Sequence, residues 1–419
     1  MQLTSINSLL SWGNIDPELD LVCLPSIQNP PPPSNHPLQQ PTIHKKKSET
    51  TNYPQYLQAN PVVKSNYVNT PIMQLRAQAE KLETASFNAL PSLGINETVI
   101  KIPMSDGTES MIRICRPAKD TNVASTSTSK EDENAQHDTD SDRSEQELTP
   151  LIALFHGGGF VVGSNLQMAI FARVFATLYK VTVASMSYRL APEHPFPTAQ
   201  NDAWDGIRWL SSPTNAALLG ANLTLGFIVG GVSAGGNLAI SVTHRSILSP
   251  LASPITGLWT AIPPTTNENG SSIPEEALSS WISRAQNADA PCLSFQDLVY
   301  LQSLLHVDPM SGVYSPFMDL CTFPALPALY VQVAGMDPLR DDGLVYEAVA
   351  REMGAQTRVD VYGGMPHGFF YYFPRLKQSV RFLVDVVRNM GWLLGREGEM
   401  DEERVVGVLG KMGSGGGSS

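Results

Sequence analysis

The stretch FIVGGVSAGGNLA, residues 227–239, places one serine, Ser233, among small uncharged residues. The apolar run LGFIVG (225–230) predicts a buried strand, and the uncharged residues after the serine predict a buried helix. A serine on such a sharp turn is typical of a nucleophile elbow. Gly231 and Gly235 lie two residues away on either side, and glycine removes the clash between these positions. A glycine-rich turn of buried backbone is the alternative, because G-x-S-x-G also occurs by chance.

Short apolar strands and amphipathic helices alternate on both sides of this stretch. Such alternation is typical of a mostly parallel sheet with helices on both faces. Two further strands, joined as a hairpin across Asp106 and Gly107, are expected before the alternating part. The expected strands are 151–155, 181–186, 225–230, 328–334 and 358–362, and the expected helices are about 167–178, 198–210, 344–353 and one from about 376.

Three successive glycines, Gly157, Gly158 and Gly159, directly follow an expected strand. Their backbone N–H groups can turn inward, free of side chains, and hold an oxyanion. The N–H of Ala234, directly after the serine, would complete this hole. The phosphate-binding patterns G-x-x-x-x-G-K-[ST] and G-x-G-x-x-G do not occur here, which disfavours a nucleotide site. His156, before the glycines, is expected to fix the loop.

His367 is the best candidate for the base that a nucleophilic serine requires. It lies in the loop GGMPHGF between the last expected strand and the last expected helix. This position is at the carboxyl edge of the sheet, where Ser233 also lies. The other seven histidines fall in the N-terminal arm, the acidic insertion, loops or a helix, and they are His36, His44, His137, His156, His194, His244 and His306.

An acid that orients the histidine is expected after a strand, in the order serine, acid, histidine. Asp337 lies three residues after the apolar run that ends at Ala334, and we prefer it. Asp341 and Asp342 are nearby rivals, but they stand where the next helix begins, so we expect them to be capping or solvated charges. The chosen acid would hold the imidazole tautomer and stabilise the imidazolium.

Five motifs together resemble the hormone-sensitive-lipase-like branch of the α/β-hydrolase fold esterases, among microbial and fungal carboxylesterases. They are HGGGF, YRLAPEHPFP, GVSAGGNLA, AGMDPLRDDG and GMPHGF. The resemblance implies nucleophile Ser233, acid Asp337, base His367 and an oxyanion hole of Gly157, Gly158, Gly159 and Ala234. Val232 departs from the pattern, because many members carry aspartate before the serine. This departure concerns hydrogen bonding near the elbow, because that position is open in G-x-S-x-G.

The resemblance also implies a cap, built from N-terminal helices and an inserted segment, above an α/β-hydrolase domain. Residues rich in Pro, Asn and Gln at the start predict a disordered or loosely attached arm, and a Ser/Thr/acidic stretch predicts a disordered insertion. The expected boundaries are 1–60 for the arm, 61–395 for the catalytic domain, about 61–90 and 262–320 for the cap, about 119–148 for the insertion and 396–419 for a C-terminal tail.

The formal charge of −12 is unevenly distributed. Residues 119–147 hold nine acidic and three basic residues, which is half of the net charge. The remainder is only mildly acidic, and this disfavours nucleic acid as a partner. The four cysteines lack metal-ligand spacing and predict reduced thiols. The N-terminus lacks the features of a secretory signal, so we expect a cytoplasmic protein without stable membrane insertion, and leave homodimer formation open.

These residues predict a serine hydrolase that cleaves carboxylic esters through an acyl-enzyme and requires no metal or organic cofactor. Trp281, Phe295 and Phe317 in the cap and the aromatic residues 369–372 beside the base predict an apolar or aromatic ester substrate. Short to medium acyl chains are implied by the resemblance. The alternatives are an acyltransferase, deacetylase or lactonase of secondary metabolism that uses the same acyl-enzyme, and a non-catalytic small-molecule binder.

Overall fold

The computed structural model describes residues 67–118 and 148–413 of the 419. The expected arm at 1–60 and the expected acidic insertion, apart from Leu148, lie outside the described residues. Within the described ranges, no helix is both long and apolar enough to cross a membrane. Three cysteines lie in these ranges as free thiols, of which Cys115 and Cys292 are buried and Cys321 is exposed.

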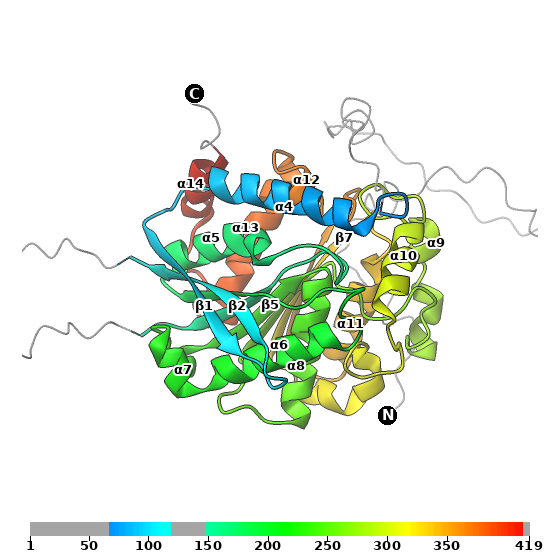
Figure 1. Ribbon diagram of the computed structural model, residues 1–419, viewed down its shortest axis with the longest axis horizontal. Coiled ribbons are helices and arrows are strands. Elements are labelled where there is room, and N and C mark those ends of the chain that lie inside the picture. The colour runs from blue at the N-terminus through cyan, green and yellow to red at the C-terminus, as the bar shows by residue number, and fades with distance from the viewer. Residues whose placement is uncertain (1–66, 119–147, 414–419) are drawn as a thin grey trace, which may run out of the picture.

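Eight strands form one twisted sheet in the order β1-β2-β4-β3-β5-β6-β7-β8 (Figure 1). The hairpin β1–β2 is antiparallel and pairs with β4 antiparallel, whereas every pairing from β4 to β8 is parallel. The prediction of a mostly parallel α/β sheet is therefore confirmed. The strands are β1 Ile95–Pro103, β2 Glu109–Pro117, β3 Leu151–Phe155, β4 Thr182–Met186, β5 Phe227–Val232, β6 Gly257–Ala261, β7 Ala328–Ala334 and β8 Thr357–Tyr362.

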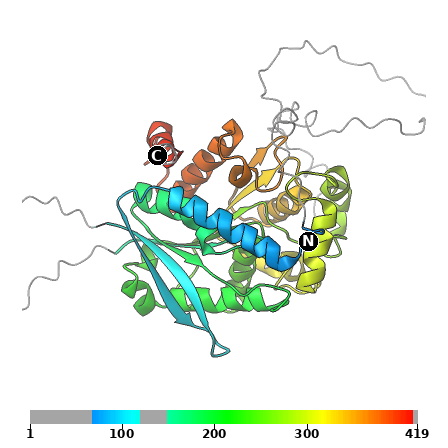
Figure 2. The same cartoon turned by 45° about the horizontal axis from the view of Figure 1, so that its top comes forward.

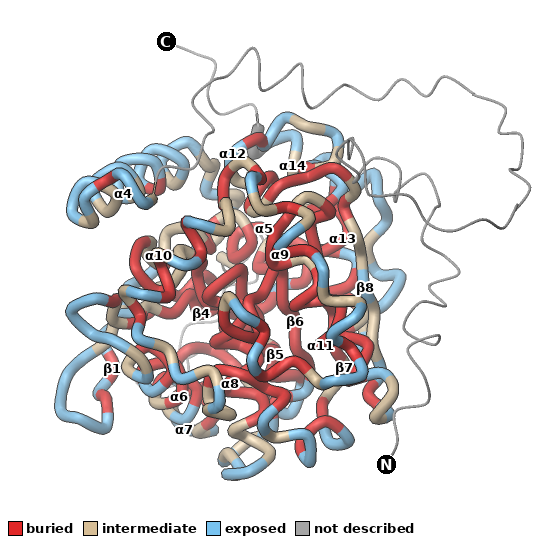
Figure 3. The backbone as a smooth tube through the Cα atoms, turned by 90° about the vertical axis from the view of Figure 1, so that its right-hand side faces the viewer, coloured by how far each residue is buried: buried red, intermediate tan, exposed pale blue. Residues whose placement is uncertain are grey.

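Helices cover both faces of the sheet and make two hydrophobic cores. One core contains Ile207 of α6, Leu238 of α8 and Val349 of α11, and the other contains Phe175 of α5 and Val387 of α13. The central strands β3, β4, β5 and β6 are buried at every residue, as strands covered on both faces must be (Figure 3). The main helices are α5 Ala169–Tyr179, α6 Thr198–Ser211, α7 Pro213–Leu218, α8 Ala234–Leu248, α11 Arg340–Glu352 and α13 Lys377–Leu393.

The two expected cap segments lie at the carboxyl edge of the parallel strands. The first is α4, Ile72–Ala89, which runs across this edge in both ribbon views (Figures 1 and 2). The second, the insert after β6, consists of short helices joined by loops. Its elements are η4 Glu275–Ser280, α9 Ser283–Gln286, α10 Phe295–Leu305 and η5 Pro316–Ala325.

Two elements differ from the sequence-based expectations. Strand β6 was not predicted, because its residues GLWTA form only a short apolar run without clear periodicity. Residues 396–419 were predicted as a tail, but α14, Glu402–Gly413, forms there and packs against α13 and α5. Its Val405 is buried in the second core, so part of the expected tail belongs to the folded domain.

Candidate active site

Ser233 stands on a strained turn between β5 and α8. Its backbone φ is +55° and ψ is −120°, a conformation that L-residues rarely adopt. The neighbours explain how the turn is possible, because a Cβ on Gly231 would lie 2.2 Å from the carbonyl oxygen of Gly235. A Cβ on Gly235 would in turn lie 2.2 Å from the carbonyl oxygen of Phe155. The glycines of the G-x-S-x-G motif are therefore required by close backbone contacts, and the turn presents the serine at the start of a helix.

His367 and Asp337 extend a hydrogen-bonded chain from this serine. The imidazole Nε2 of His367 lies 3.0 Å from Ser233 Oγ, and its Nδ1 lies 2.7 Å from Asp337 Oδ2. The second carboxylate oxygen, Oδ1, accepts the N–H of Leu339 at 2.8 Å, which fixes the carboxylate plane. Asp337 follows β7 and is fully buried, and His367 follows β8. Three residues spread over 135 positions of the sequence thus converge in the order and geometry expected from the sequence.

The glycine loop after β3 lies against the serine. A Cβ on Gly157 would lie 3.3 Å from Ser233 Cβ, so a side chain there would be tightly packed against the serine. His156 Nδ1 is hydrogen-bonded to the carbonyl oxygen of Gly157 at 2.8 Å, and its ring stacks on Tyr188 with 4.2 Å between ring centroids. Because the C=O and N–H of a trans peptide point in opposite directions, holding the Gly157 carbonyl also fixes the direction of the Gly158 N–H. Burial lowers the pKa of His156 to about 4, so the ring is neutral at pH 7.

The four amides expected to form an oxyanion hole are not equivalent. The N–H of Gly157 donates to Gln167 Oε1 at 3.1 Å and is therefore already engaged. The amides of Gly158, Gly159 and Ala234 donate to no other residue that the structure describes. The sequence could not separate the first glycine from the other two, because the partner of its N–H lies ten residues away, on another element.

A cavity of about 1390 Å³ opens beside Ser233 and His367, between the sheet edge and the cap. Its walls are mainly apolar and come from α4, α10, the segment 370–373 and α14. Of the aromatic residues 369–372 expected beside the base, Phe370, Tyr371 and Tyr372 line it, whereas Phe369 is buried in the second core. Trp281, Phe295 and Phe317 are not among its lining residues, because the insert directs their side chains elsewhere. Phe317, for example, stacks on Phe323.

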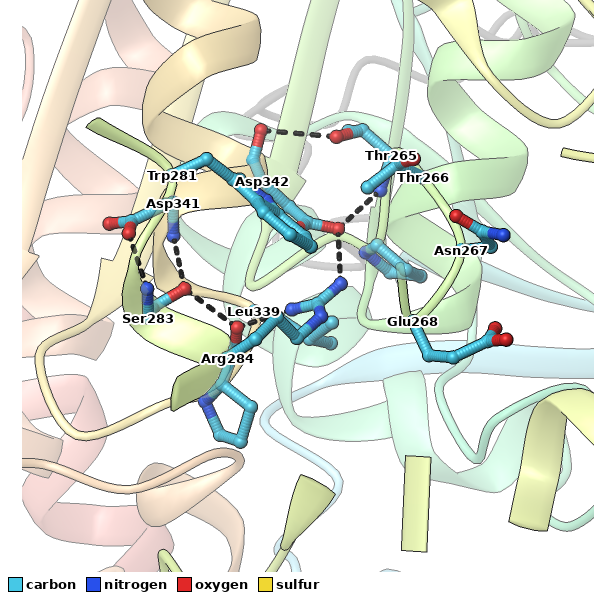
Figure 4. A network of polar contacts seen from close by, with 12 residues as sticks. Thr265, Thr266, Asn267, Glu268, Trp281, Ser283, Arg284, Leu339, Asp341 and Asp342 are labelled. Carbon is cyan, nitrogen blue, oxygen red and sulfur yellow. Dashed lines mark hydrogen bonds and ion pairs between the residues drawn. The ribbon is translucent and has the colours of Figure 1, made fainter. Parts of the chain in front are cut away.

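Asp341 and Asp342 were expected to be capping or solvated charges, and the expectation of solvation was wrong. Asp341 is 3% exposed to solvent, and Asp342 is fully buried. Both carboxylates point into the insert, where Asp341 accepts the N–H of Ser283 and Asp342 forms an ion pair with Arg284 at 2.9 Å (Figure 4). They stand at the start of α11, as predicted, but their partners lie about 58 residues earlier in the chain.

Two polar residues near the site were missed by the sequence analysis. Glu83 of α4 is 2% exposed and binds Gln167, the residue that engages the Gly157 amide. A signal for Glu83 did exist, because it continues the apolar face of α4 formed by Leu75 and Ala79 at a spacing of four residues. A charge on an apolar helix face is a sign of a buried polar partner.

Comparison with known proteins identifies relatives along most of the chain. A protein of Schizosaccharomyces pombe, the AB hydrolase superfamily protein B1A11.02, is 28% identical over 348 residues, which cover 83% of this chain and 94% of that protein. The versiconal hemiacetal acetate esterase of Dothistroma septosporum is 28% identical over 249 residues, which cover 59% of this chain and 74% of that esterase. Among solved structures, vibralactone cyclase matches with a TM-score of 0.70 at 26% identity, covering 85% of this chain and 99% of the cyclase chain.

A family model for the alpha/beta hydrolase fold matches residues 152–371, more than half of the chain. This range begins in β3 and ends just after the histidine loop, so it contains all three residues of the hydrogen-bonded chain. The resemblance inferred from the motifs is confirmed: the chain belongs to the alpha/beta hydrolase fold family, in its hormone-sensitive-lipase and carboxylesterase type.

Proposed function

We propose that the protein is a serine hydrolase that cleaves carboxylic esters through an acyl-enzyme. Its relatives of esterase type support ester hydrolysis in general. The observation that carries the proposal for this chain is the continuous contact from Asp337 through His367 to the strained Ser233. A nucleophile, a base and an orienting acid at hydrogen-bond distance are the requirements for this chemistry.

In the proposed reaction, His367 Nε2 takes the proton of Ser233 Oγ while Oγ attacks the ester carbonyl carbon. The tetrahedral intermediate collapses and expels the alkoxide, which leaves as the alcohol with the proton from His367. Water, deprotonated by His367, then attacks the acyl-enzyme, and the carboxylic acid and free Ser233 are released. Asp337 stabilises the imidazolium that forms in both halves.

The amides of Gly158, Gly159 and Ala234 are proposed to hold the oxyanion. Each is unengaged by other described residues, and removing one such donor typically costs about 10²–10³ in kcat. Gly157 is omitted from this set because Gln167 already accepts its N–H. Its role is proposed to be structural, as the glycine that lets the loop approach the serine.

The substrate is proposed to be an uncharged, apolar ester with a bulky acyl or alcohol part. Small-molecule sites typically measure about 300–1,000 Å³, and the cavity here is larger. Apart from His367, the ionisable side chains that line it are Glu83, Arg375, several tyrosines and one cysteine, so acidic and basic side chains are few. An ester of short to medium acyl chain on a large aromatic or polycyclic alcohol, such as a secondary metabolite, fits this balance of volume and polarity.

The test is the Ser233→Ala variant, assayed on p-nitrophenyl esters of increasing acyl length and labelled with a fluorophosphonate probe. We expect kcat to fall by about 10⁶-fold and labelling to disappear, because the nucleophile is gone. Ser303→Ala, which removes an exposed serine hydroxyl on α10, is the matched control and should behave as wild type. Equal hydrolysis by the Ser233→Ala variant and wild type would refute the proposal.

A second candidate function is favoured by the likeness to vibralactone cyclase. In that case a hydroxyl of the substrate itself, rather than water, would accept the acyl group from Ser233, and a lactone would form. The same three residues would act, so the two functions differ only in the acceptor. Product analysis with hydroxy-acyl esters separates them, because hydrolysis gives the free hydroxy acid and cyclisation gives the lactone.

A further inference from the structure

The buried residue of helix α4 is a glutamate, Glu83. Glu83 is the one residue of α4 that is buried, and most of the helix lies exposed at the surface (Figure 3). Burying a carboxylate costs several kcal/mol unless hydrogen bonds or a cation compensate for lost water. Burial accordingly raises the pKa of Glu83. Its place in the helix therefore requires an explanation from its partners.

Both oxygens of Glu83 accept hydrogen bonds from residues that follow the glycine loop. Ser164 Oγ donates to Oε2 at 2.5 Å, and Gln167 Nε2 donates to Oε1 at 2.8 Å. Within the described part of the chain, Glu83 forms no ion pair. Two neutral donors thus hold the carboxylate, and each of them belongs to the segment between β3 and α5.

Gln167 transmits this contact to the loop. A carboxylate only accepts hydrogen bonds, so it must face the NH₂ group of the Gln167 amide. The other end of the amide, Oε1, then faces the N–H of Gly157 and accepts it at 3.1 Å. Glu83 therefore sets the orientation of the Gln167 side-chain amide. Only in this orientation does Oε1 of Gln167 accept the N–H of Gly157.

We propose that Glu83 and Gln167 are positioning residues through which helix α4 of the cap sets the oxyanion loop. This inference rests on the proposed function. His156 holds the carbonyl of Gly157, and the Glu83–Gln167 pair holds its N–H, so the peptides on both sides of Gly157 are fixed, and the second of these carries the Gly158 N–H. Neither Glu83 nor Gln167 takes part in proton transfer. They hold the amides of Gly158 and Gly159 where a developing oxyanion can meet them.

Arg76, about two helical turns before Glu83, adds a second connection between α4 and the same loop. Its Nε donates to the carbonyl oxygen of Val161 at 2.9 Å, and Nη2 donates to that of Ala191 at 2.7 Å. The helix thus contacts the loop directly after Gly159, at Val161, and acts on Gly157 through Gln167. Displacement of α4 would release both contacts together, which couples the closing of the cap to the alignment of the loop.

The test exchanges the two polar ends of the pair. In Gln167→Glu, two carboxylates face each other, and the hydrogen bond between residues 83 and 167 is lost. In the double variant Glu83→Gln/Gln167→Glu, the new carboxylate accepts from Gly157 and from the NH₂ group of residue 83, whose carbonyl oxygen accepts from Ser164. All three hydrogen bonds and the net charge are then restored. Glu80→Gln, an exposed charge removed from the same helix, is the control.

We expect Gln167→Glu to lower kcat on p-nitrophenyl esters about 10- to 100-fold with KM changed less than threefold, since misplacement by about 1 Å can cost 10²-fold in rate. Affinity for a trifluoromethyl ketone, which forms an oxyanion on Ser233, should fall by the same factor as kcat. The double variant should recover to within fivefold of wild type, and Glu80→Gln should match wild type. Amide exchange of the segment 156–164 should quicken in the single variant and return in the double variant.

A single variant with wild-type kcat and exchange would overturn the inference. So would a loss confined to KM, or a double variant no better than Gln167→Glu. If wild type itself hydrolyses no ester and resists fluorophosphonate, the proposed function fails instead. The exchange rates of segment 156–164 then still decide whether the Glu83–Gln167 pair holds the loop.

Discussion

The two parts of the cap contact two loops of the candidate site in different ways. Helix α4 reaches the oxyanion loop through Glu83 and Arg76, from a surface position with solvent along most of its length. The insert reaches the loop of Asp337 through a buried network, in which Arg284 and Asp342 retain 6% and none of their side-chain exposure (Figure 4). Helix α4 is thus mostly exposed, whereas the network of the insert is buried in the core.

The buried network surrounds the backbone next to Asp337. Ser283 Oγ and Arg284 Nη1 both donate to the carbonyl oxygen of Pro338, and Asn287 Nδ2 donates to that of Asp337 itself. Asp342 accepts hydrogen bonds from the insert through both of its oxygens. The acid is thereby fixed by the insert as well as by β7, so the insert cannot move away without disturbing the histidine.

This difference indicates which part of the cap can open. Elements with few buried apolar contacts open at low free energy, whereas core elements open only near global unfolding. We therefore expect substrate entry to depend on α4 and the oxyanion loop, while Asp337 and His367 stay in place. Three measurements can test or refine this contrast.

Removing Arg284 should have the largest effect on stability. In Arg284→Met, Asp342 stays buried without its cation, and breaking a buried ion pair from one side typically costs about 3–5 kcal/mol. Burial already raises the pKa of Asp342, and the guanidinium opposes this. Urea unfolding followed by tryptophan fluorescence measures the loss.

Lys101→Met is the matched control for Arg284→Met. The Lys101–Glu109 pair at 2.9 Å has 65% and 60% of its side chains exposed, so its removal should change the free energy of unfolding by less than about 1 kcal/mol. Equal losses in the two variants would show that the insert is held no more firmly than a surface hairpin.

The hydrogen-bonded arrangement of Ser233, His367 and Asp337 could be predicted from the sequence because each of its parts depends on local chemistry. Gly231 and Gly235 are needed within one turn, and Asp337 and His367 each directly follow a strand of the parallel sheet. The sheet brings the ends of parallel strands to one edge, so order along the chain was enough to place the three residues together.

The contacts of α4 and of the insert with the two loops could not be predicted, because they join residues far apart in the chain. Asp342 meets Arg284 across 58 positions, and Glu83 meets Gln167 across 84. Neither helical periodicity nor a motif reports such pairs. At the start of a helix, a capping aspartate and a buried, paired aspartate have the same sequence pattern, and only the packing of the insert distinguishes them.

Two buried histidines, His156 before the glycine loop and His244 of α8 beside the insert, should make the free energy of unfolding depend on pH. Burial lowers the pKa of His244 to about 3 and that of His156 to about 4, against 6.5 in an unfolded chain. Below pH 6.5 the unfolded state therefore binds protons that the folded state does not, so stability falls as the pH falls through this window. Each histidine should remove on the order of 2 kcal/mol between pH 6.5 and 5.0.

His244→Gln separates the contribution of the insert region from that of the loop. His244 joins α8 to Thr322 of the insert and Tyr346 of α11, and glutamine keeps polar atoms there without a titrating ring. The variant should lose less stability than wild type between pH 7.5 and 5.0, as measured by urea unfolding at each pH. An unchanged pH dependence would mean that this histidine is not held neutral in the folded state.

Arg76→Ala should have a smaller effect on global stability than loss of the buried ion pair, although it removes the contacts of Arg76 with Val161 and Ala191 and leaves those of Glu83 in place. Its partner Glu193 is 49% exposed, so the ion pair contributes little, and we expect a loss of about 1 kcal/mol from the two backbone hydrogen bonds. Glu193→Ala removes the ion pair alone and should change stability by less than about 0.5 kcal/mol. Amide hydrogen exchange in the first half of α4 should nevertheless quicken in Arg76→Ala, because Arg76 joins this part of the helix to two backbone carbonyls. If amide hydrogen exchange quickened equally in the insert, the two parts of the cap would open together. The contrast between the exposed helix α4 and the buried network of the insert would then be wrong.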